Sequence, residues 1–389
     1  MNKVRTESAR NAAQHNSLHN WLYLRHTTGL GNRTFLDLLE AFNSVDNIFN
    51  ASHQQLSTVI SDTRIKPEVI SALKNEKRPD IDADLTWLSQ DSSHHIITLF
   101  DETYPAQLKE LSDAPPILYV RGDPEYLKQP QLAMVGTRNP TAAGRNTAKE
   151  FANHLSSAGI TITSGLATGI DGASHEGALH GIAGTIAVVA HGLDIIYPAQ
   201  HQKLAQNICE QGAVVSEMPI GTQLQRGLFP RRNRLISALS LGTLIVEAAQ
   251  KSGSLITARY AAEQNKEVFA IPGSIHNPMA KGCHQLIRQG AKLVETAGDI
   301  LEELCIGTSK TSEYPKKSVA NTQENPKDSP QALDPDHQKL LKCLAYEPAS
   351  IDELVLNSHF SAAEVASMLL ILELEGIVVS QNGRYTCVS

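Results

Sequence analysis

Short apolar runs alternate with helix-length amphipathic segments through the middle of this 389-residue chain. Glycine or polar residues bound the runs, and helical segments such as 145–157 separate most of them. The alternation predicts a doubly wound, mostly parallel α/β sheet of the Rossmann-like type, because parallel strands need crossover connections. The predicted strands are 132–136, 160–165, 184–192, 213–217, 243–247, 267–273 and 291–295. A mixed, proline-punctuated stretch, 96–119, leads into this sheet, and we expect the whole domain to span 86–305.

The pattern changes at 306–335, which is rich in Ser, Thr, Pro, Asn and Lys and nearly lacks large apolar residues. Such a segment buries too little surface to fold, so we interpret it as a flexible linker. A short helical pattern follows at 337–345, and a hairpin is expected around 381–383. Two Ser-x-x-Glu capping boxes open further helices: Ser350 with Glu353, and Ser361 with Glu364. Three helices and a hairpin predict a winged helix over 336–389.

The first 85 residues form a third region, with a helical pattern over 21–56 that Gly29-Leu30-Gly31 interrupts. A short glycine turn between two helices is similar to a helix-hairpin-helix or sterile-alpha-motif unit. We therefore expect a small N-terminal helical domain. Two interpretations of it stay open, a bundle used for packing and a DNA contact.

The length suits two or three domains of about 100 to 200 residues each. The sequence contains no run of about 18 apolar residues, the length needed to cross a bilayer. The first 20 residues lack the apolar stretch of a secretory signal, and the five cysteines are scattered without paired spacing. These features predict a reduced, cytoplasmic protein.

The net charge of −7, taken alone, argues against a polyanionic partner. Its distribution along the chain changes that picture. Residues 131–300 hold 14 Lys and Arg against 11 Asp and Glu, a net charge of +3. Within them, 218–246 carries four arginines and no acidic residue. Such a local field attracts phosphates.

The residues that follow the predicted strands carry the candidate chemistry, because ligands of open parallel sheets bind beyond the carboxyl ends of the strands. Glycines there let backbone amides approach an anion, and an arginine adds a forked, charged donor. After the first strand the candidates for phosphate binding are Gly136, Thr137 and Arg138. After the second strand they are Ser164, Gly165, Ala167, Gly169 and Asp171.

A second group of candidates lies in the motif FPRRNRLIS at 229–237, which is expected to begin a helix at the same edge of the sheet. The group comprises Arg231, Arg232, Asn233 and Arg234. A charge run of this kind is often a solvated helix face, but its position beside the other turns favours phosphate binding. Gly253 and Ser254 follow the fifth strand, and Lys281, after the sixth, is either a phosphate contact or a plain surface residue. Phe229 is either a stacking face for a base or a core residue.

Several anion-binding turns on one edge exceed the needs of one mononucleotide and fit a strand of linked phosphates. The dinucleotide fingerprint Gly-x-Gly-x-x-Gly does not follow the first strand, and the P-loop pattern is absent. We expect a binding protein rather than an enzyme, with no cofactor and no metal. The enzyme alternative is a nucleotide or nucleoside-phosphate hydrolase of the lysine-decarboxylase-like group, whose PGGxGTxxE motif is matched in part by 242–247. A structural adaptor is a third possibility, which leaves the arginines unexplained.

Taken together, these motifs resemble the DNA-processing protein A family, DprA, also called Smf. The resemblance rests on seven segments in order: VGTR with a later Gly (135–144), SGLATGID (164–171), GLD and YP (192–198), FPRRNRLIS (229–237), GSLITAR (253–259), IPG (271–273) and GCHQLIRQGA (282–291). It covers the whole Rossmann-like domain and, more loosely, the flanks. His284 is a departure, because the family often has Asn there.

The resemblance implies a protein that binds single-stranded DNA, protects it during natural transformation and loads the RecA recombinase onto it. It implies homodimerisation through the Rossmann-like domain. It also places the binding pocket on Arg138, the SGLATGID turn, the Arg231–Arg234 cluster and Gly253-Ser254.

Overall fold

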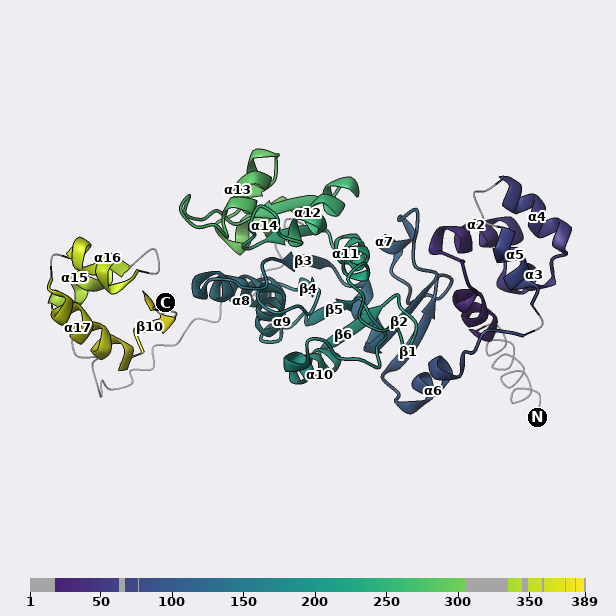
Figure 1. The fold of residues 1–389 in the computed structure, drawn as a ribbon, viewed down its shortest axis with the longest axis horizontal. Helices are drawn as coiled ribbons and strands as arrows, with labels where there is room; N and C mark the ends of the chain where they lie inside the picture. The colour runs from purple at the N-terminus through teal and green to yellow at the C-terminus, as the bar shows by residue number, and fades with distance from the viewer. Residues whose placement is uncertain are drawn as a thin grey trace, which may run out of the picture. The chain divides into compact units, whose positions relative to one another are not determined.

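The structure, a computed structural model, describes residues 18–62, 67–75, 77–304, 335–344, 349–358, 360–374, 376–381 and 383–387 (Figure 1). These residues divide into two compact units. The larger unit holds the described residues up to Leu304, apart from Thr141–Ala143, and the smaller holds those from Pro335 onward. The predicted linker lies outside the described residues except for Pro335.

A nine-stranded sheet forms the centre of the larger unit, in the order β1-β2-β6-β5-β4-β3-β7-β8-β9. Every strand predicted from the apolar runs is present: β3 (Gln131–Val135), β4 (Thr161–Ser164), β5 (Thr185–Val189), β6 (Gly212–Ser216), β7 (Gly242–Ile245), β8 (Glu267–Ala270) and β9 (Lys292–Leu293). These seven pair in parallel. The prediction of a doubly wound, mostly parallel sheet is confirmed.

The proline-punctuated lead-in adds two strands that the sequence did not predict. β1 (His94–Thr98) pairs antiparallel with β2 (Ile117–Gly122), which pairs antiparallel with β6. A short helix, α7 (Ala106–Lys109), lies between the two strands. This segment is therefore an edge of the sheet and not only a lead-in to it.

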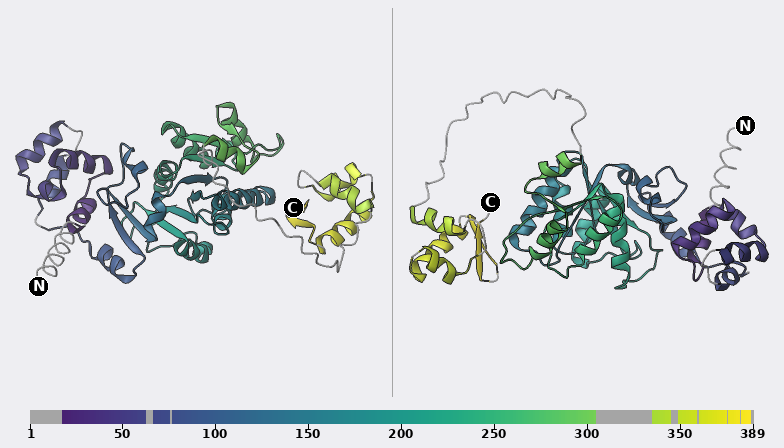
Figure 2. Two further views of the ribbon diagram at one scale, coloured as in Figure 1. Left: turned by 180° about the vertical axis from the view of Figure 1, so that it is seen from behind. Right: turned by 90° about the horizontal axis from the view of Figure 1, so that it is seen from above.

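Helices cover both faces of the sheet, because successive residues of each buried strand point to opposite sides. Along β3, Leu132 and Met134 join one apolar core, while Ala133 and Val135 join another. The helices of this layer are α8 (Ala142–Ser157), α9 (Ile170–Ala178), α10 (Gln202–Glu210), α11 (Leu228–Leu239), α12 (Ser254–Glu263), α13 (Lys281–Arg288) and α14 (Ala297–Glu303), with 3₁₀ turns η1 (Pro124–Lys128) and η2 (Ala199–His201). Figure 2 shows them on the two sides of the sheet.

The strand order reverses beside β3. From β3 the chain moves through β4 and β5 to β6, and then returns to the other side of β3 as β7. A reversal of this kind opens a crevice at the carboxyl ends of the strands. The turns after β3, β4 and β7 are therefore brought together.

The N-terminal residues of the larger unit are helical, as predicted. A helix over 18–26 is followed by α2 (Asn32–Phe42), α3 (Val45–Asn50), α4 (His53–Asp62), α5 (Pro67–Leu73) and α6 (Asp82–Gln90). Gly29, at the predicted turn, has a φ of +83°, which favours glycine. Trp21 stacks on Phe35 with ring centroids 5.4 Å apart in the core of these helices.

The smaller unit is the predicted winged helix. It contains α15 (Pro335–Leu344), α16 (Ile351–Ser358), α17 (Ala362–Leu374) and the hairpin β10 (Val378–Gln381) with β11 (Arg384–Cys387). In both predicted capping boxes the serine hydroxyl accepts the glutamate N–H, and the carboxylate accepts the serine N–H in return. Across the described ranges, no single helix has the length and apolar composition of a membrane span; only the bent pair α16 and α17 meets both criteria together.

Candidate functional site

Asp171 stabilises the turn that follows β4. The Asp171 carboxylate accepts the N–H of Gly165 at 3.1 Å, and it is 7% exposed. Burial raises the pKa of Asp171, and the neighbouring Arg232 opposes this shift. Sequence reasoning placed Asp171 among the phosphate contacts. The structure corrects this, because the carboxylate faces inward, where it shapes the turn by accepting backbone N–H groups.

The turn after β3 is packed against the same loop. The N–H of Thr137 donates to the Glu247 carbonyl at 2.7 Å, and the Thr137 carbonyl accepts the N–H of Ile170 at 3.1 Å. Gly169 has a φ of +83°, and a Cβ there would lie 2.4 Å from the Thr137 carbonyl oxygen. The predicted glycine is therefore required where these two turns meet. Arg138, which follows, is exposed.

Arg232 passes beneath these turns from α11. It is 6% exposed, and its Nη1 donates to the Val188 carbonyl at 2.5 Å. A Cβ built at Gly165 would lie 2.0 Å from that Nη1, so only glycine leaves room for the guanidinium. Burial lowers the pKa of Arg232 to about 10, and the Asp171 carboxylate opposes that shift. Arg232 therefore stays charged at neutral pH.

A small hollow opens above this arginine. The rings of Tyr197 and Phe229 form part of its wall, with centroids 6.2 Å apart, and the Arg138 guanidinium lies 5.8 Å from the Phe229 ring centroid. The complete lining is Arg138, Gly165, Ala167, Thr168, Val189, Ala190, His191, Tyr197, Pro198, Phe229 and Arg232. The hollow thus combines two aromatic faces, two guanidinium groups and small-residue backbone.

A second hollow shares a wall with the first, because Arg138 and Thr168 line both. Its other lining residues are Asn139, Arg145, Gly169, Gly172, Ala173, Glu176, Gln200 and His201. Most of the lining is polar. The two hollows therefore adjoin at Arg138 and Thr168, at the carboxyl edge of the sheet, and we call them together the groove.

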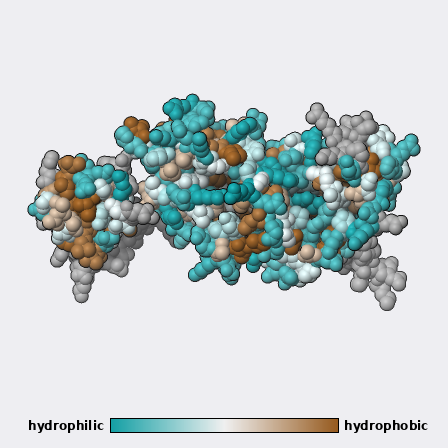
Figure 3. All heavy atoms as spheres, in the orientation of Figure 1, coloured by the Kyte–Doolittle hydropathy of each residue, from teal (hydrophilic) through white to brown (hydrophobic). Residues whose placement is uncertain are grey.

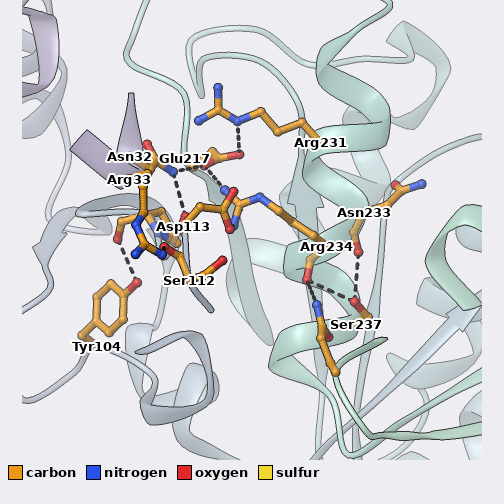
Figure 4. Close-up of polar contacts among 12 residues, drawn as sticks. Asn32, Arg33, Tyr104, Ser112, Asp113, Glu217, Arg231, Asn233, Arg234 and Ser237 are labelled. Atoms are coloured by element: carbon orange, nitrogen blue, oxygen red, sulfur yellow. Dashed lines mark hydrogen bonds and ion pairs between the residues drawn. The ribbon is translucent and has the colours of Figure 1, made fainter. Parts of the chain in front are cut away.

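The arginine cluster of α11 is divided between two places. Arg231 and Arg234 both turn toward Glu217 (Figure 4). The expectation that all of the arginines face the phosphate edge is corrected for Arg234, whose side chain is 6% exposed, whereas that of Arg231 is 39% exposed. Nε of Arg231 lies 3.2 Å from Oε1 of Glu217. The helical geometry explains the division, since residues three apart share a face and Arg232 is rotated about 100° from Arg231. Asn233 is half-buried and points away from Glu217 (Figure 4).

The remaining candidates lie outside the two hollows. Gly253 is exposed before α12, and Ser254 shares a hydrogen bond of 2.7 Å with Ser252. Lys281 is exposed at the first residue of α13. In the same helix, Nε2 of His284 lies 2.9 Å from the Gly273 carbonyl oxygen. Among the residues that the structure describes, no three His, Cys, Asp or Glu side chains are grouped as metal ligands.

Family models match both units. The model described as DNA recombination-mediator protein A matches residues 95–305, and the DprA winged helix domain matches 324–384. The chain belongs to the DprA family. The resemblance predicted from the motifs is confirmed.

Relatives of this DprA family member support the same assignment. Protein Smf of Escherichia coli K12 is 41% identical over 309 residues, which are 79% of this chain and 81% of that protein. DNA processing protein DprA of Bacillus subtilis is 44% identical over 209 residues, 54% of this chain and 70% of that protein.

Two solved DprA structures share the fold. DNA processing protein A of Streptococcus pneumoniae superposes with a TM-score of 0.64 at 36% identity, covering 73% of this chain and 97% of that one. DNA processing protein A of Helicobacter pylori, described for its unique single-stranded DNA binding mode, superposes with a TM-score of 0.50 at 32% identity. That match covers 54% of this chain and 96% of that one.

Several residues that line the groove of this DprA family member were not predicted from the sequence. Tyr197 belongs to the YP pair, which carried part of the resemblance but was given no role, and His191 lay within the predicted strand 184–192. Arg145, Gln200 and His201 had no distinct signal. The YP pair at the end of a long loop after a strand could have indicated Tyr197, because ligands gather at that edge.

Proposed function

We propose that this chain binds single-stranded DNA in the groove formed by the two hollows, protects it, and helps to load RecA recombinase during DNA uptake and recombination. The observation that carries the proposal is the placement of Arg138 beside the Phe229 and Tyr197 rings, over the buried Arg232. The H. pylori relative, described for its single-stranded DNA binding mode, supports the choice of ligand.

The chemistry of the groove suits a single strand better than a duplex. Unpaired bases expose their faces, and each base stacked on an aromatic ring contributes about 1–3 kcal/mol. The exposed guanidinium of Arg138 provides a forked donor for a phosphate. Arg232 is already engaged with a backbone carbonyl, so it adds positive potential from beneath rather than an exposed contact.

The candidate residues take different roles in this proposal. Gly165, Ala167 and Gly169 line the groove, where their small size leaves space for the strand. Gly136, Thr137 and Ser164 act from beneath by shaping the turns; Ser164 is fully buried, and its hydroxyl donates to the Met134 carbonyl. Asn233, Gly253, Ser254 and Lys281 extend the path of the strand beyond the groove. Arg234 acts on the fold through Glu217 and not on DNA. Arg231 pairs with Glu217 through Nε and is 39% exposed, so it stays a candidate DNA contact.

The hydrolase alternative gains no support from its motif residue. Glu247 is 8% exposed, and a Cβ at Gly144 would lie 2.3 Å from its Cδ. The Glu247 carboxylate is thus buried against Gly144, beneath the turn. We therefore favour binding over catalysis at this edge.

We propose further that the chain works in the cytoplasm as a homodimer. In this proposal the linker 306–335 joins the winged-helix domain, 336–389, to the Rossmann-like domain, 86–305, and the helical domain of 1–85 shares an apolar core with the latter. The RecA contact is inferred from the family to which the chain belongs.

Binding of labelled oligonucleotides, followed by fluorescence anisotropy, tests the proposal. We expect a preference for single-stranded over duplex DNA, and at least about tenfold weaker single-strand binding by Arg138→Ala. Arg33→Ala is the matched control, because that side chain is 67% exposed on α2 and takes no part in the groove. Equal binding of single-stranded and duplex DNA by the wild type would contradict the proposal.

A further inference from the structure

The outer face of α17 in the smaller unit is apolar and uncovered. Leu370, Ile371 and Leu374 are 59%, 41% and 81% exposed. Their spacing of three and four residues places them on one face of the helix. The exposed Ala363 and Ala366 continue this stripe toward the helix start. Figure 3 shows apolar side chains gathered over α17. We call the five residues the α17 stripe.

The fold of the unit does not need this stripe. The opposite face of α17 already supplies Val365, Leu369 and Leu372 to the core, and these are fully buried. A surface helix that only completes a core has polar residues on its outer face. Exposed apolar residues grouped on one face of a helix mark an interaction site.

The charge around the stripe indicates what it binds. Residues 362–374 contain Glu364 and Glu373 and no Lys or Arg. Residues 335–389 hold seven Asp and Glu against three Lys and Arg, a net charge of −4. Helices that enter a DNA groove rely on cationic side chains for phosphate contacts. Duplex DNA, an anionic membrane and a second copy of this unit would all be repelled, whereas a cationic partner would be attracted.

The chain's own connecting segment offers no counterpart. An occupant of the stripe must present apolar residues at helical spacing, and 306–335 nearly lacks large apolar residues. The segment that joins the two units is therefore not the occupant, and the acidic surroundings of the stripe favour a cationic partner.

We propose that the α17 stripe docks a basic amphipathic helix of a partner protein. Leu370, Ile371 and Leu374 form the apolar contact, and Glu364 and Glu373 pair with Lys or Arg of the partner. The partner helix would lay its apolar face on the stripe, with the acidic residues on either side of it. The function of the winged helix would then be protein binding, independent of DNA binding in the larger unit.

The test uses the full chain and two synthetic labelled helices. One carries Leu on one face and Lys on the other, and the second has Glu in place of every Lys. We expect the Lys helix to bind the wild type, and to bind the Leu370→Ser, Leu374→Ser double variant at least about tenfold more weakly. Ile182→Ser is the matched control, because Ile182 is 81% exposed in the larger unit, and it should bind as the wild type does.

Each alternative outcome is distinct. Equal binding of the Lys helix by the double variant, or equally tight binding of the Glu helix, would overturn the proposal. Loss of duplex binding, of binding to phosphatidylglycerol vesicles or of self-association in the double variant, with Lys-helix binding retained, would overturn it in favour of that occupant. Far-UV circular dichroism confirms that the exposed substitutions leave the unit folded.

Discussion

Arg234 and Glu217 form a buried ion pair, with 2.5 Å between Nη2 and Oε2. Arg234 is 5% exposed and Glu217 is 2% exposed. The same Glu217 oxygen accepts a hydrogen bond from Nδ2 of Asn32 at 2.9 Å, and the Glu217 carbonyl accepts one from Arg25 at 3.0 Å. Glu217 therefore ties α11 to the N-terminal helices, and one face of α11 serves this junction while Arg232 serves the groove.

Arg234→Ala is predicted to destabilise the larger unit strongly, because it leaves the Glu217 carboxylate buried without its main partner. Removing one member of a buried pair costs about 3–5 kcal/mol. Chemical denaturation followed by circular dichroism measures the free energy of unfolding. Lys203→Ala, at an exposed position on α10, is the control and should change it by less than about 0.5 kcal/mol. A loss of less than about 1 kcal/mol in Arg234→Ala would show that the pair does not hold this junction.

Gly165→Ala is predicted to weaken single-stranded DNA binding by displacing Arg232. The new Cβ would lie 2.0 Å from Nη1, so the guanidinium must leave the Val188 carbonyl. Gly227→Ala is the matched control, because a Cβ there meets nothing within 4 Å. We expect at least tenfold weaker binding, about 1.4 kcal/mol, in the first variant only. Equal affinities of the two variants would show that the position of Arg232 does not affect DNA binding.

Phe229→Ala is predicted to lose a base contact rather than a phosphate contact. The expected loss is about 1–3 kcal/mol of single-strand binding energy, with the salt dependence unchanged. An abasic oligonucleotide provides the control, because it keeps the phosphates and lacks the bases. The wild type and Phe229→Ala should bind it alike. A variant that is weaker on the abasic strand as well would place Phe229 in the core and not at a base.

Stability should fall in mild acid because of His175. Burial, helped by the nearby His201 and Arg232, lowers the pKa of His175 to about 3, whereas an unfolded histidine titrates near 6.5. Between these values the unfolded chain binds the extra proton, so the free energy of unfolding decreases as pH falls, by about 1.4 kcal/mol per pH unit. Denaturation at pH 7.5 and 5.5 measures this slope.

His175→Gln should flatten that slope, while His154→Gln, at an exposed position on α8, should leave it unchanged. The same slope in wild type and His175→Gln would assign the pH dependence to other groups.

The fold could be predicted from the sequence more completely than the site could. Buried parallel strands such as β5 appear as continuous apolar runs, so their number and order could be predicted from pattern alone. β1 was missed because its sequence, HHIIT, mixes polar and apolar residues and belongs to an edge. Antiparallel edge strands carry weaker signals than buried parallel ones.

The direction in which each side chain points could not be read from the motifs. FPRRNRLIS gives three arginines, but which of them faces the groove depends on the rotation of α11, set by packing against Glu217 and the N-terminal helices. The direction of the Asp171 side chain could not be predicted either, since a carboxylate at a helix start can face either solvent or its own turn. Position along the chain identifies the edge of the sheet, and tertiary packing decides which side chains reach it.

The salt dependence of single-stranded DNA binding tests the central claim most directly. The slope of log K against log salt counts the phosphates contacted, at about 0.7 per phosphate for single strands. Measured on wild type, Arg138→Ala and the Arg33→Ala control, the slope should fall by about 0.7 in Arg138→Ala alone. An unchanged slope in Arg138→Ala, with affinity unchanged as well, would contradict a phosphate-binding groove at this edge of the sheet.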